Sequence, residues 1–169
     1  MADLGNVPNR SMRLFALITV ICVGLLAFAF YLQHGLHLDP CPWCVVQRLV
    51  YIAVALIALV GVLHRPGPTG ATAYACLGVV ASLAGVAAAG YNVYLQSDPA
   101  RAAKCVGSPV ERILDSLAIG DLVPSYLQYD GPCTLKPWSF LGLSIPEWSF
   151  IWFAILVVLF LAIPFTAKR

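Results

Sequence analysis

Two cysteines three residues apart, Cys41 and Cys44, are the side chains of this sequence best suited to chemistry. They lie in the segment Cys41-Pro42-Trp43-Cys44-Val45-Val46-Gln47-Arg48, directly before an apolar run. A Cys-x-x-Cys pair at the start of a helix is typical of thiol–disulfide exchange, because the helix dipole and a nearby cation both stabilise the reactive thiolate. Arg48 supplies that cation, since it follows Cys44 by four residues and therefore lies on the same helical face.

The composition indicates that this pair sits in a membrane protein. The chain has 169 residues, of which 60% are hydrophobic and 11% charged, and its mean hydropathy is +0.85. Soluble domains are about 45–50% apolar and about 25% charged. The net charge of +2 is too small and too scattered to indicate a nucleic-acid partner. We therefore expect residues 1–169 to form a single integral membrane domain.

Four apolar runs predict membrane-spanning helices at about 14–32, 45–63, 71–95 and 148–163. The first has 19 residues without a charge, long enough to cross about 30 Å of hydrocarbon. A cleaved signal peptide is the alternative there, because Ala27-Phe28-Ala29 resembles a cleavage site, although the run continues through Leu32. The third run carries small residues four apart, which lets helix backbones approach closely. The expected fold is an all-α, four-helix transmembrane bundle.

Basic residues predict the orientation of these spans. With four spans, one side of the membrane receives Arg10, Arg13, Arg65, Lys168 and Arg169, whereas the loop 33–43 has no Lys or Arg. Under the positive-inside rule both termini are cytoplasmic, and the segments 33–43 and 97–147 face outward.

The outward segment 97–147 is polar and carries most of the charges. Within it, Ser108-Pro109-Val110-Glu111 predicts the start of a short helix through a capping box with proline at its first position. Apolar residues then recur at helical spacing up to Leu117, and Gly120 is the expected stop. This amphipathic helix can lie on the bilayer surface or pack on its own loop, and the sequence leaves both placements open.

Four of the six cysteines are expected on the outer side: Cys41, Cys44, Cys105 and Cys133. A zinc site is disfavoured, because the second pair is 28 residues apart and forms no second zinc knuckle, so no metal is predicted. Two static disulfides are possible, but a Cys41–Cys44 bond closes a very short loop and constrains the unfolded chain little. That spacing suits a reactive disulfide better, which favours a redox relay. Within spans, Cys22 and Cys76 are expected to be small, buried apolar side chains.

The first cysteine segment resembles the CxxCxxxR motif of the disulfide bond formation protein B family, the inner-membrane thiol:quinone oxidoreductases of bacteria. Further segments are similar to family segments: Leu95-Gln96, Asp121-Leu122-Val123-Pro124, and Trp138 to Trp148 with its Phe-Leu-Gly-Leu sequence. The likeness covers nearly the whole chain, from the first span to the last.

The resemblance implies an enzyme of disulfide bond formation in exported proteins. It would re-oxidise a periplasmic thioredoxin-like dithiol oxidase and pass the electrons through Cys105/Cys133 and Cys41/Cys44 to a membrane quinone, either ubiquinone or menaquinone. Cys105 would take the mixed disulfide, with the charges of Arg101 and Lys104 favouring its thiolate.

The residues expected at the quinone are Arg48, Asn92 and Gln96. Some family members carry a basic ring residue near the outer end of the third span, where this chain has Tyr91-Asn92, and the Asn92 amide can donate a hydrogen bond to a quinone carbonyl. Gln96 can equally be an ordinary polar residue of the interface, and Arg48 can instead contact a lipid phosphate.

Three other functions remain as alternatives. One is a non-catalytic four-span scaffold whose disulfides brace the outer loop, which would not need Arg48 beside Cys44. Another is a related oxidase that serves a dedicated partner. The third is a reductase resembling the vitamin K epoxide type, whose Cys-x-x-Cys lies on a late span rather than at the start of the second.

Overall fold

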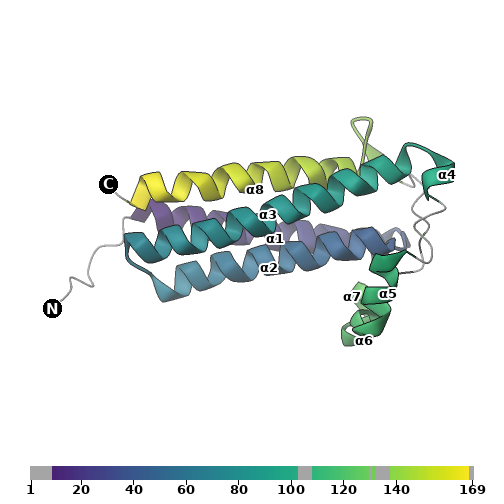
Figure 1. The fold of residues 1–169 in the computed structure, drawn as a ribbon, viewed down its shortest axis with the longest axis horizontal. Coiled ribbons are helices and arrows are strands. Elements are labelled where there is room, and N and C mark those ends of the chain that lie inside the picture. Colours follow the sequence, from purple (N-terminus) through teal and green to yellow (C-terminus); the bar gives the residue numbers. More distant parts are fainter. Residues whose placement is uncertain (1–8, 103–107, 130, 132–137, 168–169) are drawn as a thin grey trace.

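The computed structural model describes residues 9–102, 108–129, 131 and 138–167, and its largest elements are four long helices (Figure 1). They are α1 (Asn9–Gly35), α2 (Pro42–His64), α3 (Pro68–Gln96) and α8 (Ile145–Ala167). All four are long and apolar enough to cross a membrane, and the runs predicted at 14–32, 45–63, 71–95 and 148–163 fall inside them. The chain is therefore an all-α, multi-pass membrane protein, as the sequence predicts.

Proline and a left-handed residue set boundaries of α2 and α3. Both helices begin with a proline, which is favourable because the first helical N–H has no partner within the helix. After His64 the backbone of Arg65 turns left-handed, with φ of 46°, and α2 ends. In α8 the helix continues through Pro164 to Ala167.

The four helices pack in a ring in which α1 contacts α2, α2 contacts α3, α3 contacts α8, and α8 contacts α1. The α3–α8 contact is the most extensive, and small residues on α3 make it possible. A Cβ atom at Gly78 would lie 2.2 Å from the Phe160 ring, and one at Gly85 would lie 2.4 Å from the Phe153 ring. The small-residue pattern predicted from the sequence therefore leaves room for two aromatic rings of α8 to pack against α3.

The two cysteines inside the spans differ in burial. Cys22 of α1 is buried, as expected, whereas Cys76 of α3 is exposed, so the prediction that both are buried is wrong for Cys76.

The two ends of the bundle differ (Figure 1). The start of α1, the end of α8 and the turn between α2 and α3 lie at one end. The start of α2, the end of α3 and the short helices lie at the other, which we call the outer end. Cys41 and Cys44, at the start of α2, are thus at the opposite end of the bundle from Arg10, Arg13 and Arg65.

Among the residues that the structure describes after α3, four short helices occur: α4 (Pro99–Ala102), α5 (Pro109–Ser116), α6 (Ile119–Leu122) and α7 (Pro124–Leu127). α5 is the helix predicted from the capping box, and the Glu111 N–H donates to Ser108 Oγ over 3.2 Å. Leu114 is buried against Val45 of α2 and Leu127 of α7, whereas Ile113 is exposed. One side of α5 therefore packs on the outer end of α2.

The predicted stop of this helix at Gly120 is wrong. α5 ends at Ser116, and Gly120 belongs to α6. The break occurs at Ala118, whose left-handed backbone (φ 49°) turns the chain between the two helices. An alanine in this conformation gives no signal in the sequence, because glycine and asparagine are the usual residues there.

A two-stranded hairpin precedes α8, formed by β1 (Ser139–Phe140) and β2 (Leu143–Ser144). Leu141 and Gly142, both with positive φ, make the two-residue turn. The Ser144 N–H and hydroxyl then donate to Glu147 Oε2, over 2.6 and 2.7 Å, as α8 begins. Strands this short were not predicted, and they place the segment before α8 against the outer end of that helix.

Candidate active site

Cys41 and Cys44 lie together at the first turn of α2, as their spacing predicts. Cys41 is the residue before the helix, Pro42 is its first residue, and the Cys44 and Val45 N–H groups donate to the Cys41 carbonyl over 2.9 and 3.1 Å. The two Sγ atoms are 2.9 Å apart, and the Cys41 side chain is buried. Its hydrogen bond with Cys44 and its burial raise the pKa of the Cys41 thiol well above its ordinary value.

Asn92 of α3 lies directly at this sulfur pair. Its side chain is fully buried, and Nδ2 is 3.7 Å from Cys41 Sγ and 3.6 Å from Cys44 Sγ. An amide N–H directed at sulfur stabilises negative charge there, because hydrogen bonds to a charged form favour that form. The structure therefore brings Asn92 to the cysteines, whereas its contact with a quinone carbonyl stays a prediction.

A cavity of about 700 Å³ opens beside Cys44, between α1, α2 and the start of α8. Binding sites for small molecules have volumes of about 300–1,000 Å³ and mostly apolar walls with a few polar groups. The walls here follow that pattern. They include Cys44, Gln47, Arg48 and Tyr51 of α2; Leu25, Leu26, Phe28, Ala29 and Leu32 of α1; Gln96; Trp138 and Phe140; and Trp148, Ser149 and Trp152.

Two of the predicted cofactor residues, Arg48 and Gln96, line this cavity. Gln96 closes α3, and its Oε1 atom is buried without a hydrogen-bond partner among the residues that the structure describes. Gln96 at the end of α3 and Cys44 at the start of α2 thus both line the cavity.

Arg48 is buried, with 7% of its surface exposed, and its guanidinium is held by protein groups. It donates to Gln33 Oε1 over 2.6 Å, to the Ala29 carbonyl over 3.5 Å and to the Tyr126 carbonyl. The guanidinium carbon (Cζ) of Arg48 also lies 4.6 Å from the centre of the Tyr126 ring. These contacts disagree with the alternative in which Arg48 reaches out to a lipid phosphate.

Tyr126 ties α7 to the helix bundle at the same point. Its hydroxyl donates to the Leu26 carbonyl of α1 over 3.0 Å. Burial raises the pKa of that hydroxyl, so it stays protonated and remains a donor. Arg48 therefore links three elements, α1, α2 and α7, at the edge of the cavity.

The second cysteine pair, Cys105 and Cys133, lies outside the described residues, but Gly131 is described and lies close to the first pair. Its N–H donates to the Pro40 carbonyl over 3.1 Å, immediately before Cys41. A Cβ atom at residue 131 would lie 2.1 Å from the Asp39 carbonyl oxygen, so only glycine fits. In the sequence, Cys133 follows Gly131 by two residues.

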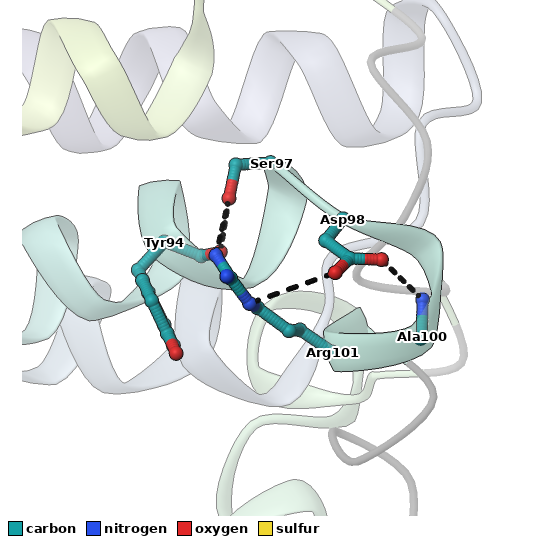
Figure 2. Close-up of polar contacts among 5 residues, drawn as sticks. All are labelled: Tyr94, Ser97, Asp98, Ala100 and Arg101. Carbon is teal, nitrogen blue, oxygen red and sulfur yellow. Dashed lines mark hydrogen bonds and ion pairs between the residues drawn. The ribbon is translucent and has the colours of Figure 1, made fainter.

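Arg101 was expected to favour a thiolate at Cys105, and Figure 2 shows its surroundings. Its Nε is 3.6 Å from Asp98 Oδ2, its guanidinium donates to Ser97 Oγ over 3.2 Å, and its carbon is 4.4 Å from the centre of the Tyr94 ring. The carboxylate of Asp98 already offsets this positive charge. An effect of Arg101 on Cys105 therefore stays a prediction.

Sequence reasoning missed several residues of this site. Gln47 offered a usable signal, since a polar residue inside an apolar span next to Arg48 calls for an explanation. Gln33, Tyr126 and Gly131 offered none, because their contacts join segments that are far apart in the chain.

The sequence of this chain is similar to those of proteins that share one name. The family model "Disulfide bond formation protein DsbB" matches residues 10–163. Proteins named "Disulfide bond formation protein B" are 41% identical over 145 residues in Aromatoleum aromaticum (86% of this chain, 87% of that protein) and 40% identical over 146 residues in Marinobacter nauticus (86% and 87%). The one from Herminiimonas arsenicoxydans is 39% identical over 160 residues, covering 95% of this chain and 98% of that protein. The chain therefore belongs to the disulfide bond formation protein B family, which its cysteine motif already indicated.

Proposed function

We propose that this protein, whose family acts in disulfide bond formation, is a thiol:quinone oxidoreductase. It re-oxidises a periplasmic thioredoxin-like dithiol oxidase and passes the electrons through Cys105/Cys133 and Cys41/Cys44 to ubiquinone or menaquinone in the membrane. The observation that carries this proposal is the position of Cys44, which forms part of a cavity wall while its sulfur lies 2.9 Å from that of Cys41. Cys41 lines the same cavity, so electrons that reach this sulfur pair can pass to an acceptor bound there.

The proposed reaction consists of three two-electron exchanges. A thiolate of the partner attacks the Cys105–Cys133 disulfide at Cys105, and the second partner thiol resolves the mixed disulfide, which leaves the partner oxidised and the loop pair reduced. The loop dithiol then reduces the Cys41–Cys44 disulfide in the same way. The Cys41–Cys44 dithiol finally loses two electrons and two protons to the quinone, which restores its disulfide.

Gly131 supports the second exchange. Its hydrogen bond to the Pro40 carbonyl holds the chain two residues before Cys133 beside the residue that precedes Cys41. Thiol–disulfide exchange requires one sulfur to approach another directly. The contact at Gly131 therefore serves to deliver the loop pair to the first pair.

The cavity fits a quinone ring in volume and in chemistry. Its walls are mostly apolar and aromatic, as an apolar ring requires, and it lies between helices that are apolar enough to reach the lipid phase. Arg48 lies one turn deeper than Cys44 and places a positive charge where negative charge develops on the acceptor. A bound quinone supplies the two-electron acceptor and leaves as the quinol.

The same proposal sets the location of the protein. In the bacterial inner membrane, the end of the bundle that carries Arg10, Arg13 and Arg65 faces the cytoplasm under the positive-inside rule. Both termini are then cytoplasmic, and the cysteine pairs face the periplasm, where the partner oxidase is found.

The test measures quinone reduction by ultraviolet absorbance, with purified protein in detergent and a reduced thioredoxin-like oxidase as the donor. Cys44→Ala is expected to abolish turnover. The matched control is Cys76→Ala, a cysteine exposed on α3, which is expected to keep it. Absence of turnover with both ubiquinone and menaquinone in the wild-type protein, while its disulfides remain oxidised, would leave the loop-bracing scaffold as the function.

A further inference from the structure

Gln47 lies in the wall of the cavity beside Cys44, and the reaction proposed above gives it no role. It is three residues after Cys44 and directly before Arg48. With 3.6 residues per turn and a rise of about 1.5 Å per residue, the Gln47 side chain leaves the helix about 4.5 Å deeper than Cys44. Gln47 and Arg48 point to opposite sides of the Cys44 direction, so the two polar groups flank the sulfur.

The side-chain nitrogen of Gln47 is buried and lacks a hydrogen-bond partner among the described residues. The residue is 4% exposed, and the unpaired atom is Nε2. An unpaired buried donor is unfavourable, and more so at membrane depth, where water is scarce. Such a group is retained where a ligand completes its hydrogen bonding.

Arg48 does not make this donor redundant. Its guanidinium is engaged by Gln33 and by the carbonyls of Ala29 and Tyr126. Several N–H groups of Arg48 are therefore directed at α1 and α7, whereas the Gln47 amide is available to a ligand in the cavity.

We propose that Gln47 is a quinone-binding residue whose side-chain amide donates a hydrogen bond to a carbonyl oxygen of the quinone. This inference rests on the proposed function, because it assigns the ligand of the same cavity. The Gln47 side-chain nitrogen can only donate hydrogen bonds, and a quinone carbonyl oxygen can only accept them, so the two groups are complementary. The contact fixes the ring beside the Cys44 sulfur, and it favours rings that carry carbonyl oxygens over apolar rings of the same shape.

The test uses binding rather than turnover. Menadione is titrated into the purified full-length protein in detergent, and binding is followed by quenching of tryptophan fluorescence, since Trp138, Trp148 and Trp152 line the cavity. Methylnaphthalene, which has the same rings without carbonyl oxygens, is measured by its displacement of menadione. In Gln47→Leu the Kd of menadione is expected to rise about five- to tenfold, the value of one hydrogen bond, while that of methylnaphthalene stays the same.

A stability measurement separates this role from a structural one. Gln47→Leu removes an unpaired buried amide, so the unfolding temperature of the quinone-free protein should stay level or rise. Gln47→Met, which keeps the length of the side chain, gives the same test if the leucine variant does not fold. Gln128→Leu, at an exposed glutamine of the loop, is the control and should change neither affinity.

The outcomes separate this inference from the proposed function. A wild-type protein that neither binds nor reduces menadione overturns both. A wild-type protein that does both, with an unchanged menadione Kd in Gln47→Leu and Gln47→Met, overturns the role of Gln47 alone. An equal loss of affinity for menadione and methylnaphthalene also overturns it, because shape rather than the carbonyl oxygen would then be recognised.

Discussion

Gly131→Ala should disconnect the outer cysteine pair from the Cys-x-x-Cys pair without damaging either. The added Cβ would lie 2.1 Å from the Asp39 carbonyl oxygen and has to retreat by about 1 Å to reach even the shortest contacts of real Cβ atoms. That shift breaks the 3.1 Å hydrogen bond from the residue 131 N–H to the Pro40 carbonyl. A displacement of about 1 Å between reacting groups can reduce a rate about 100-fold, and we expect that loss in turnover with the protein donor.

The assay compares two donors. A reduced thioredoxin-like oxidase delivers electrons through Cys105/Cys133, whereas dithiothreitol can reduce the Cys41–Cys44 disulfide directly. Gly131→Ala should slow quinone reduction only with the protein donor and keep the dithiothreitol rate. Gly67→Ala is the matched control, because a Cβ atom there meets nothing within 4 Å. Equal rates for wild type and Gly131→Ala with the protein donor would refute the reasoning, and so would an equal loss with both donors.

Three further predictions concern the bundle and the site. Gly85→Ala should lower the free energy of unfolding in detergent by about 1–3 kcal/mol, because its Cβ would lie 2.4 Å from the Phe153 ring. Gly24→Ala is the control, since a Cβ atom there has open space around it, and equal unfolding temperatures for the two variants would contradict the prediction. Asn92→Leu removes an amide that stabilises the reduced sulfur pair by about 1 kcal/mol, which corresponds to a reduction potential about 20 mV more negative. Equilibration with a thiol redox buffer measures this potential, and an unchanged value would exclude the role of Asn92. Arg48→Lys loses the paired guanidinium contacts with α1 and α7, so steady-state kinetics should show a KM for quinone about tenfold higher. An unchanged KM would show that the guanidinium is not needed.

The features that the sequence predicts are those that depend on neighbours in the chain. Apolar runs locate the four long helices because a membrane-crossing segment has to be continuous. The capping box at Ser108 correctly places the start of α5, since the whole signal lies within one turn. The meeting of Cys41 and Cys44 likewise follows from their spacing at a helix start.

The remaining features depend on contacts between distant segments. Gly131 fits only because Asp39 and Pro40 lie against it, and no local pattern encodes that contact. Arg48 looks like an interfacial charge until its partners on α1 and α7 are known. Ala118 ends α5 by adopting a conformation unusual for alanine, so the glycine two residues later was a misleading stop signal.

The most direct test of the account is a single turnover of the Cys41–Cys44 dithiol with quinone. In a protein carrying Cys105→Ala and Cys133→Ala, the pair is reduced, freed of reductant without oxygen, and mixed with a limiting amount of menadione. One quinone should be consumed for each pair of thiols lost. Alkylation followed by mass spectrometry should place the loss at Cys41 and Cys44, with Cys22 and Cys76 unchanged. Menadione that remains oxidised while both thiols stay free would contradict it.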